Sequence, residues 1–104
     1  MRQFDVVANA SPDTCQQIPF LLVLQADLLD ELATRVVAPL IPLSQYGPPL
    51  DKLNPVIVID GDSYVVSIAE LAGIPVRALG ERVTSILDDR LEIISALDFL
   101  ITGS

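Results

Sequence analysis

The side chains that usually carry enzyme chemistry are few in this chain. It has no histidine, which removes the usual general base and the commonest metal ligand. Its single cysteine, Cys15, can form neither an internal disulfide nor a thiol-rich metal site. The sequence also contains no glycine-rich phosphate loop and no Gly-x-Ser-x-Gly elbow. We therefore expect a protein that is not an enzyme and that binds no cofactor or metal.

One acidic motif could bind a cation. Asp60-Gly61-Asp62 resembles the start of an oxygen-rich calcium loop, but such a loop requires further ligands at a fixed spacing. Apolar runs flank the motif on both sides, and Asp-Gly between such runs is a strong hairpin signal. We expect a hairpin turn at this position and no metal site.

The charge of the chain limits its partners. Fourteen acidic residues face six basic ones, for a net charge of −8. Binding to a phosphate backbone depends on clustered Lys and Arg. The basic residues are scattered along the sequence, at Arg2, Arg35, Lys52, Arg77, Arg82 and Arg90. We therefore expect no direct contact with nucleic acid.

Length and hydropathy indicate one small domain, residues 1–104, with a modest core. No apolar run approaches the roughly 18 to 20 residues of a membrane span, so no membrane association is expected. Asp5 interrupts the region where a signal peptide would continue to be apolar. We expect a cytoplasmic protein, and the lone Cys15 is consistent with a reducing compartment. The hydrophobic content of 51% favours oligomerisation.

Short apolar runs between turn-forming residues indicate that most of the chain is β structure. Predicted strands cover residues 3–9, 20–25, 34–43, 55–59, 63–68 and 75–79. The run at 20–25 is apolar enough to be buried on both faces. Pro39 and Pro42 should place the second half of the third strand at an edge or a bend, because proline cannot donate to a ladder. Turn-rich segments at 10–17 and 45–54 predict loops, the second of them exposed.

From Gly80 to the end, the sequence predicts one helix whose last third is apolar nearly all the way round. At about 100° per residue, Phe99 falls in the middle of the polar arc. The apolar arc has two interpretations: simple packing against the sheet, or core packing combined with a surface for another chain. Because so small a domain can hardly enclose this helix, we expect a homodimer. The residues of the apolar arc are Val83, Ile86, Leu87, Ile93, Ile94, Ala96, Leu97, Leu100 and Ile101.

The fold class that these elements predict is mainly β, a small antiparallel sheet closed by one C-terminal helix. In that frame the chain resembles the CcdB family of toxins from toxin-antitoxin pairs. The resemblance covers nearly the whole chain and rests on five segments in order, QFDVVAN, VLQADLLDELATRVVAPL, PVIVIDGDSYVV, AGIPVRALGERV and ALDFLITG.

The resemblance implies a fold and an activity. Members of this family are cytoplasmic homodimers with a barrel-like sheet of the Src-homology-3-like, plasmid-maintenance-toxin type, a small wing and a C-terminal helix. They bind the A subunit of DNA gyrase and trap the cleaved-DNA complex without cutting DNA themselves. A cognate CcdA-like antitoxin wraps and extracts the toxin with a disordered tail, and operator DNA is bound only through the antitoxin.

The resemblance also implies a binding site. The gyrase-binding residues would be Leu28, Leu29, Asp98, Thr102, Gly103 and Ser104. Without it, Leu28 and Leu29 would be read as half-buried leucines of an ordinary turn.

Two alternatives concern activity. The best-known family pattern ends in Trp-Gly-Ile, whereas this chain ends in Thr102-Gly103-Ser104. That difference is consistent with an attenuated or non-toxic homologue that has kept antitoxin binding. The other alternative is an endoribonuclease toxin of similar fold, which would need a basic RNA groove and a proton-transfer group. This chain offers neither a histidine nor a basic cluster.

Overall fold

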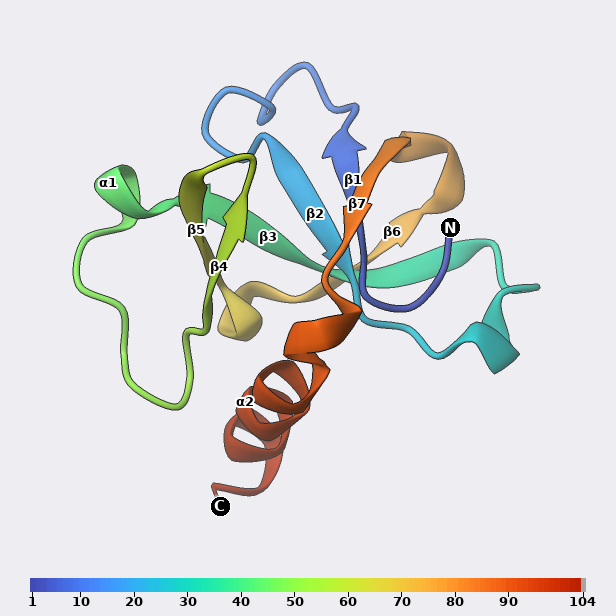
Figure 1. The fold of residues 1–104 in the computed structure, drawn as a ribbon. Helices are drawn as coiled ribbons and strands as arrows, with labels where there is room; N and C mark the ends of the chain where they lie inside the picture. The colour runs from blue at the N-terminus through green and yellow to red at the C-terminus, as the bar shows by residue number, and fades with distance from the viewer. Residues whose placement is uncertain (104) are drawn as a thin grey trace.

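A computed structural model describes residues 1–103, in which a curled antiparallel sheet carries one C-terminal helix (Figure 1). The predicted fold class is confirmed. The strands are β1 (Asp5–Asn9), β2 (Phe20–Val23), β3 (Thr34–Pro42), β4 (Val56–Ile59), β5 (Asp62–Val66), β6 (Ala72–Pro75) and β7 (Leu79–Ser85). The α-helices are α1 (Leu43–Tyr46) and α2 (Arg90–Thr102).

Strand β3 lies in the middle of the sheet, whose order is β4-β5-β3-β2-β1-β7 with β6 also paired to β3. Of the two predicted positions for its second half, an edge or a bend, the edge is therefore wrong. One side of β3 pairs with β2, while the other pairs first with β6 and then with β5. Pro39 falls between these last two partners, where its carbonyl accepts a hydrogen bond from the Ser67 N–H at 3.0 Å. Proline has no backbone N–H, and at Pro39 this side of the strand faces the gap between β6 and β5, where no ladder hydrogen bond is lost.

The predicted hairpin at Asp60-Gly61 is confirmed. Strands β4 and β5 pair up to Ile59 and Asp62, which leaves a two-residue turn. Asp60 and Gly61 have φ values of 51° and 86°, as a type I′ turn requires. This hairpin, β4–β5, is the wing of the molecule and extends to one side of the sheet (Figure 1).

The C-terminal quarter differs from the prediction of a single helix from Gly80, which is wrong. Residues 79–85 form β7, which pairs with β1, and α2 starts only at Arg90 after a 3₁₀ turn. A Cβ on Gly80 would lie 2.8 Å from the Ala8 carbonyl oxygen. The absence of a side chain there lets the two strands approach closely. The predicted strand at 75–79 is also wrong, because β6 ends at Pro75 and a 3₁₀ turn follows.

The main core lies between the sheet and α2. Its buried side chains include Val6, Leu22, Leu40, Val66 and Ile93. A smaller cluster on the other face contains Val7, Leu21, Val23 and Val37. Alternate residues of β2 therefore point into the two clusters, which confirms that this strand is buried on both faces.

The two predicted loops differ in how much regular structure and burial they contain. Residues 10–17 form the expected turn-rich loop. The segment 45–54 is mostly exposed, but it includes the end of α1 and the buried Asn54, whose Oδ1 accepts the Leu50 N–H at 2.9 Å. Within residues 1–103, no helix has the length and apolar content needed to cross a membrane.

Candidate functional site

Helix α2 has two apolar stripes, only one of which packs in the core. Ile93 and Ala96 are fully buried against the sheet, and Leu97 and Leu100 pack beside them. The other stripe is exposed. Its members recur at intervals of three and four residues, which places them on one face of the helix. We call Leu91, Ile94, Asp98 and Ile101 the displayed stripe.

The broad apolar arc that the sequence predicts has a buried part and an exposed part, and the exposed part belongs to the displayed stripe. Leu91, Ile94 and Ile101 are exposed by 71%, 42% and 75%, so these side chains take no part in the core. Asp98, one of the predicted gyrase-binding residues, lies among them. Core packing therefore accounts for one face of the helix only, and a surface for another chain stays a prediction for the exposed face.

The end of α2 is fixed by hydrogen bonds. Thr102 Oγ1 donates to the Asp98 carbonyl at 2.7 Å. Gly103 has φ 76°, in the left-handed region, and its N–H donates to the Phe99 carbonyl at 2.9 Å, which ends the helix in an αL cap. The structure therefore places Asp98, Thr102 and Gly103 together, while the predicted Ser104 lies outside the described residues.

A groove of about 930 Å³ runs between α2 and the segment 49–56. Phe99 and Gly103 line it from the helix, and Leu50 and Val56 line it from the segment. Phe99 is 36% exposed and points away from the main core, as its place in the polar arc predicts. The helix end therefore offers an apolar recess beside the predicted contact residues.

The other predicted residues lie on the loop that joins β2 to β3. Residues 26–33, which we call the leucine loop, contain a 3₁₀ turn at Asp27–Leu29 in which no residue is buried. Leu28 is 94% exposed and Leu29 is 51% exposed. The interpretation of half-buried leucines is therefore wrong for Leu28 and holds for Leu29.

The six predicted residues fall into two groups. In Figure 1 the leucine loop and the C-terminal end of α2 project from the sheet in different directions. Within one chain, the structure does not bring Leu28 and Leu29 into one patch with Asp98, Thr102 and Gly103.

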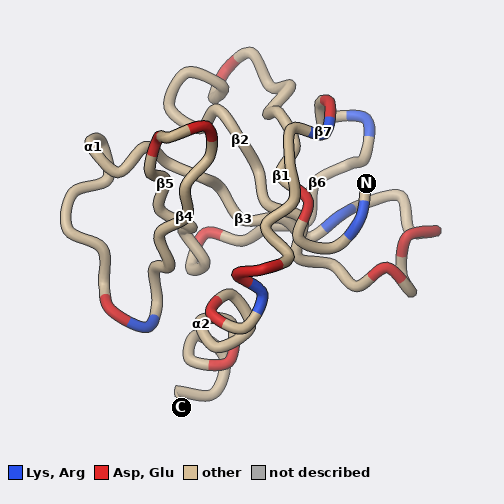
Figure 2. The backbone as a smooth tube through the Cα atoms, viewed as in Figure 1, with Lys and Arg blue, Asp and Glu red and all other residues tan. Residues whose placement is uncertain are grey.

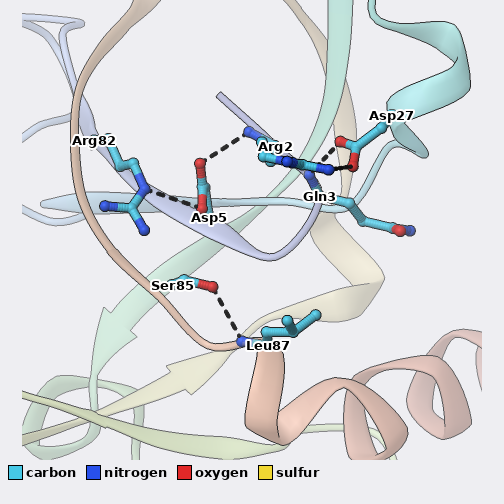
Figure 3. Close-up of polar contacts among 7 residues, drawn as sticks. All are labelled: Arg2, Gln3, Asp5, Asp27, Arg82, Ser85 and Leu87. Carbon is cyan, nitrogen blue, oxygen red and sulfur yellow. Dashed lines mark hydrogen bonds and ion pairs between the residues drawn. The ribbon is translucent and has the colours of Figure 1, made fainter.

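An electrostatic network anchors the leucine loop to the N-terminus (Figure 3). Asp27 Oδ1 accepts the Gln3 N–H at 2.8 Å, and Asp27 Oδ2 pairs with Arg2 Nη2 at 3.3 Å. The Gln3 hydrogen bond is the main cause that lowers the pKa of Asp27, and Arg2 lowers it further. The loop is thereby tied to residues that precede β1.

The same network continues to β7 through a buried carboxylate. Asp5 is 4% exposed and accepts the Arg2 N–H at 2.9 Å. Its other oxygen pairs with Arg82 Nε at 3.2 Å. Because a buried carboxylate needs such partners, Asp5 links the N-terminus to β7.

The acidic side chains are dispersed over the surface. In the part of the chain that the structure describes, no group of three or more acidic or cysteine side chains could hold a metal ion. Figure 2 shows acidic positions spread over the leucine loop, the wing turn and the start of α2. Acidic positions thus lie on the same segments as exposed leucines of the loop and exposed valines of the wing.

The described residues thus form a small, mainly β protein with one C-terminal helix, with exposed leucines on the leucine loop and exposed Leu91, Ile94 and Ile101 on the helix. The family model described as CcdB protein matches residues 3–103, and the chain belongs to the CcdB family, whose members are toxins of toxin-antitoxin pairs that target gyrase. The resemblance seen in the sequence is thus confirmed. No individual curated protein matches the chain significantly.

Proposed function

We propose that this protein is the toxin of a type II toxin-antitoxin system, that it binds the A subunit of DNA gyrase, and that it traps the gyrase-DNA cleavage complex. The observation that carries the proposal is Leu28, which is 94% exposed on an ordered loop. Neighbouring exposed apolar side chains, here Leu28 and the half-exposed Leu29, are typical of an interaction site. Family membership supports gyrase as the target, and we assign this anchor to the gyrase contact.

Both predicted groups are assigned to gyrase binding in this proposal. Leu28 and Leu29 supply apolar contacts from the leucine loop. Asp98, Thr102, Gly103 and Ser104 supply the contacts of the helix end, whose αL cap presents Gly103 with open space around its Cα. A second copy of the chain would supply a second set of both groups.

The proposed partners also include a second copy and an antitoxin. The displayed stripe, with Leu91 71% and Ile101 75% exposed, gives apolar area that a homodimer or an antitoxin tail would cover. The net charge of −8 favours an indirect contact with operator DNA, made through the antitoxin. The setting that suits these partners is the cytoplasm.

Gyrase supercoiling and cleavage assays with the purified protein test the proposal, each run with and without ATP. The wild-type protein should inhibit supercoiling and accumulate cleaved DNA. Leu28→Asp should abolish both effects without changing the thermal midpoint. Val58→Asp is the matched control, since Val58 is 63% exposed on the wing, away from both groups. If the wild-type protein leaves gyrase unaffected, the proposed target is wrong.

A weaker, attenuated toxin is the second candidate, and the terminus Thr102-Gly103-Ser104 favours it because the family pattern ends in Trp-Gly-Ile. Tryptophan is the richest binding hot spot, and a terminal isoleucine adds apolar area. Thr102→Trp with Ser104→Ile should therefore strengthen growth arrest of a gyrase-competent bacterium. Unchanged toxicity would show that the natural terminus is already sufficient.

A further inference from the structure

The leucine loop is held in shape by polar side chains, while its apolar side chains remain in water. Gln25 Nε2 donates to the Leu29 carbonyl at 2.8 Å, and Gln25 Oε1 accepts the Val36 N–H at 3.1 Å. One amide therefore links the 3₁₀ turn to the first residues of β3. Loops are more often fixed by apolar side chains that become buried. In this loop polar side chains fix the backbone, and the leucine side chains stay exposed.

Arg35 fixes the second half of the loop. Its Nη1 donates to the carbonyls of Leu32, at 2.6 Å, and Thr34, at 3.0 Å, and its Nη2 donates to the Asp30 carbonyl. Among residues 1–103 the guanidinium forms no ion pair. Its planar array of donors instead holds three carbonyls of one short segment, which a lysine ammonium cannot do with the same geometry.

The clamped segment displays a third leucine. Leu32 is 52% exposed, and its N–H donates to the Leu29 carbonyl at 3.2 Å, which holds it one turn away from Leu29. Leu28, Leu29 and Leu32 are thus three exposed leucines of one short, hydrogen-bonded loop, and we call them the knob. A binding loop ordered in advance loses little conformational entropy when it meets its partner.

Two carboxylates border the knob and indicate what surrounds the complementary pocket. Asp30 and Glu31 are exposed, and in the described part of the chain neither forms an ion pair. Figure 2 shows these acidic positions at the outer end of the loop. An apolar pocket with a rim of Lys or Arg side chains would match this surface in both hydropathy and charge.

We propose that Leu32 is a further gyrase-contacting residue and that Arg35 is the positioning residue that presents it, with Asp30 and Glu31 facing a basic rim around an apolar pocket on the gyrase A subunit. This inference rests on the proposed function. It adds a residue that is set by this chain's own loop, and it assigns a purpose to the only arginine that donates to three carbonyls among residues 1–103.

The test measures the affinity of the purified full chain for a purified gyrase A subunit. Leu32→Ala should weaken binding about tenfold, as expected when the exposed half of the leucine side chain becomes covered in the complex. Val58→Ala on the wing is the control and should leave the affinity unchanged. Raising the salt concentration should weaken wild-type binding more than binding by the double variant Asp30→Asn and Glu31→Gln.

The test of Arg35 needs a measurement that would stay the same if the arginine only stabilised the fold. Arg35→Gln and Arg35→Lys should each weaken binding about tenfold in the wild-type chain but have little effect when Leu28, Leu29 and Leu32 are all alanine, because the arginine acts through these leucines. Amide exchange should speed up at residues 29–34 and stay unchanged in β1 and β2. Using both variants keeps the test valid if one of them folds poorly.

The outcomes separate this inference from the proposed function. If the wild-type chain binds gyrase and Leu32→Ala binds equally well, Leu32 is not a contact and the inference is overturned, while the proposed function stands. If the arginine variants weaken binding equally in both backgrounds, Arg35 does not act through the knob. If the wild-type chain does not bind the gyrase A subunit, the proposed function and this inference are both rejected.

Discussion

Two neighbouring isoleucines of α2 should respond very differently to the same substitution. Ile93 is fully buried in the main core, whereas Ile94 is 42% exposed on the displayed stripe. Ile93→Ala removes the packing of a buried side chain and leaves a cavity, at a cost of about 3 kcal/mol. For a domain of this size that loss lowers the thermal midpoint by roughly 15 °C. Ile94→Ala should cost less than about 1 kcal/mol, as a surface position does.

Thermal and denaturant unfolding of both variants, at several protein concentrations, provides the measurement. If a second copy covers the displayed stripe, the deficit of Ile94→Ala should grow with protein concentration, because dimerisation then contributes to the stability of the wild-type chain. The Ile93→Ala deficit should appear at every concentration. Equal losses for the two variants at all concentrations would mean that the helix packs through a different face, and the division into two stripes would be wrong.

Two further predictions concern backbone packing and pH. Gly80→Ala should destabilise the protein by roughly 1 to 3 kcal/mol, because its Cβ would lie 2.8 Å from the Ala8 carbonyl oxygen; Gly73→Ala, with open space around it, should have little effect in the same unfolding assay. The lowered pKa of Asp27 contributes stability above the pKa of the unfolded chain, and this contribution is lost as pH falls through the folded-state pKa. The unfolding free energy of Asp27→Asn should therefore fall less steeply with acid than that of the wild type, and identical slopes would contradict the assignment.

Local patterns predicted most of the strands. The wing hairpin followed from Asp60-Gly61 because a two-residue turn with positive φ values depends on the residues in the turn itself. Strand β2 followed from an apolar run that is long enough to serve both faces of the sheet. Such features depend on neighbouring residues, and a single sequence contains the information they need.

Features that depend on distant pairing were missed. Residues 79–85 form β7 because β1 is available as a partner and because Gly80 permits close approach to Ala8. Apolar residues spaced three and four apart there matched a helix equally well, so the pattern alone favoured the wrong element. The edge prediction for β3 failed for a similar reason, because the gap opposite Pro39 is created by the separate positions of β5 and β6.

The resemblance named Leu28, Leu29 and the helix end as gyrase-binding residues, and that assignment stays a prediction. Nothing in the sequence singled out Leu32 or Arg35, because exposure and carbonyl contacts are properties of the folded loop. An arginine directly before a β-branched run, following a loop with three leucines, was a signal only in retrospect. The predicted apolar arc included Ile94 and Ile101 of the displayed stripe but not Leu91, and the separation of the exposed face from the buried face required the orientation of α2.

The gap opposite Pro39 also has a consequence for how the protein opens. The wing is joined to β3 through residues 40–42, and β6 is joined to it through the separate run 34–37. Segments that share continuous hydrogen bonds open together. Because the pairing on this side of β3 is interrupted at Pro39, the segments on its two sides should open separately. The wing should detach as one unit while β1, β2 and β7 stay paired, and its amides should exchange with solvent as a group ahead of theirs. The gap between the partners of β3, at Pro39, is thus the expected boundary between the part of the sheet that opens first and the part that carries the leucine loop.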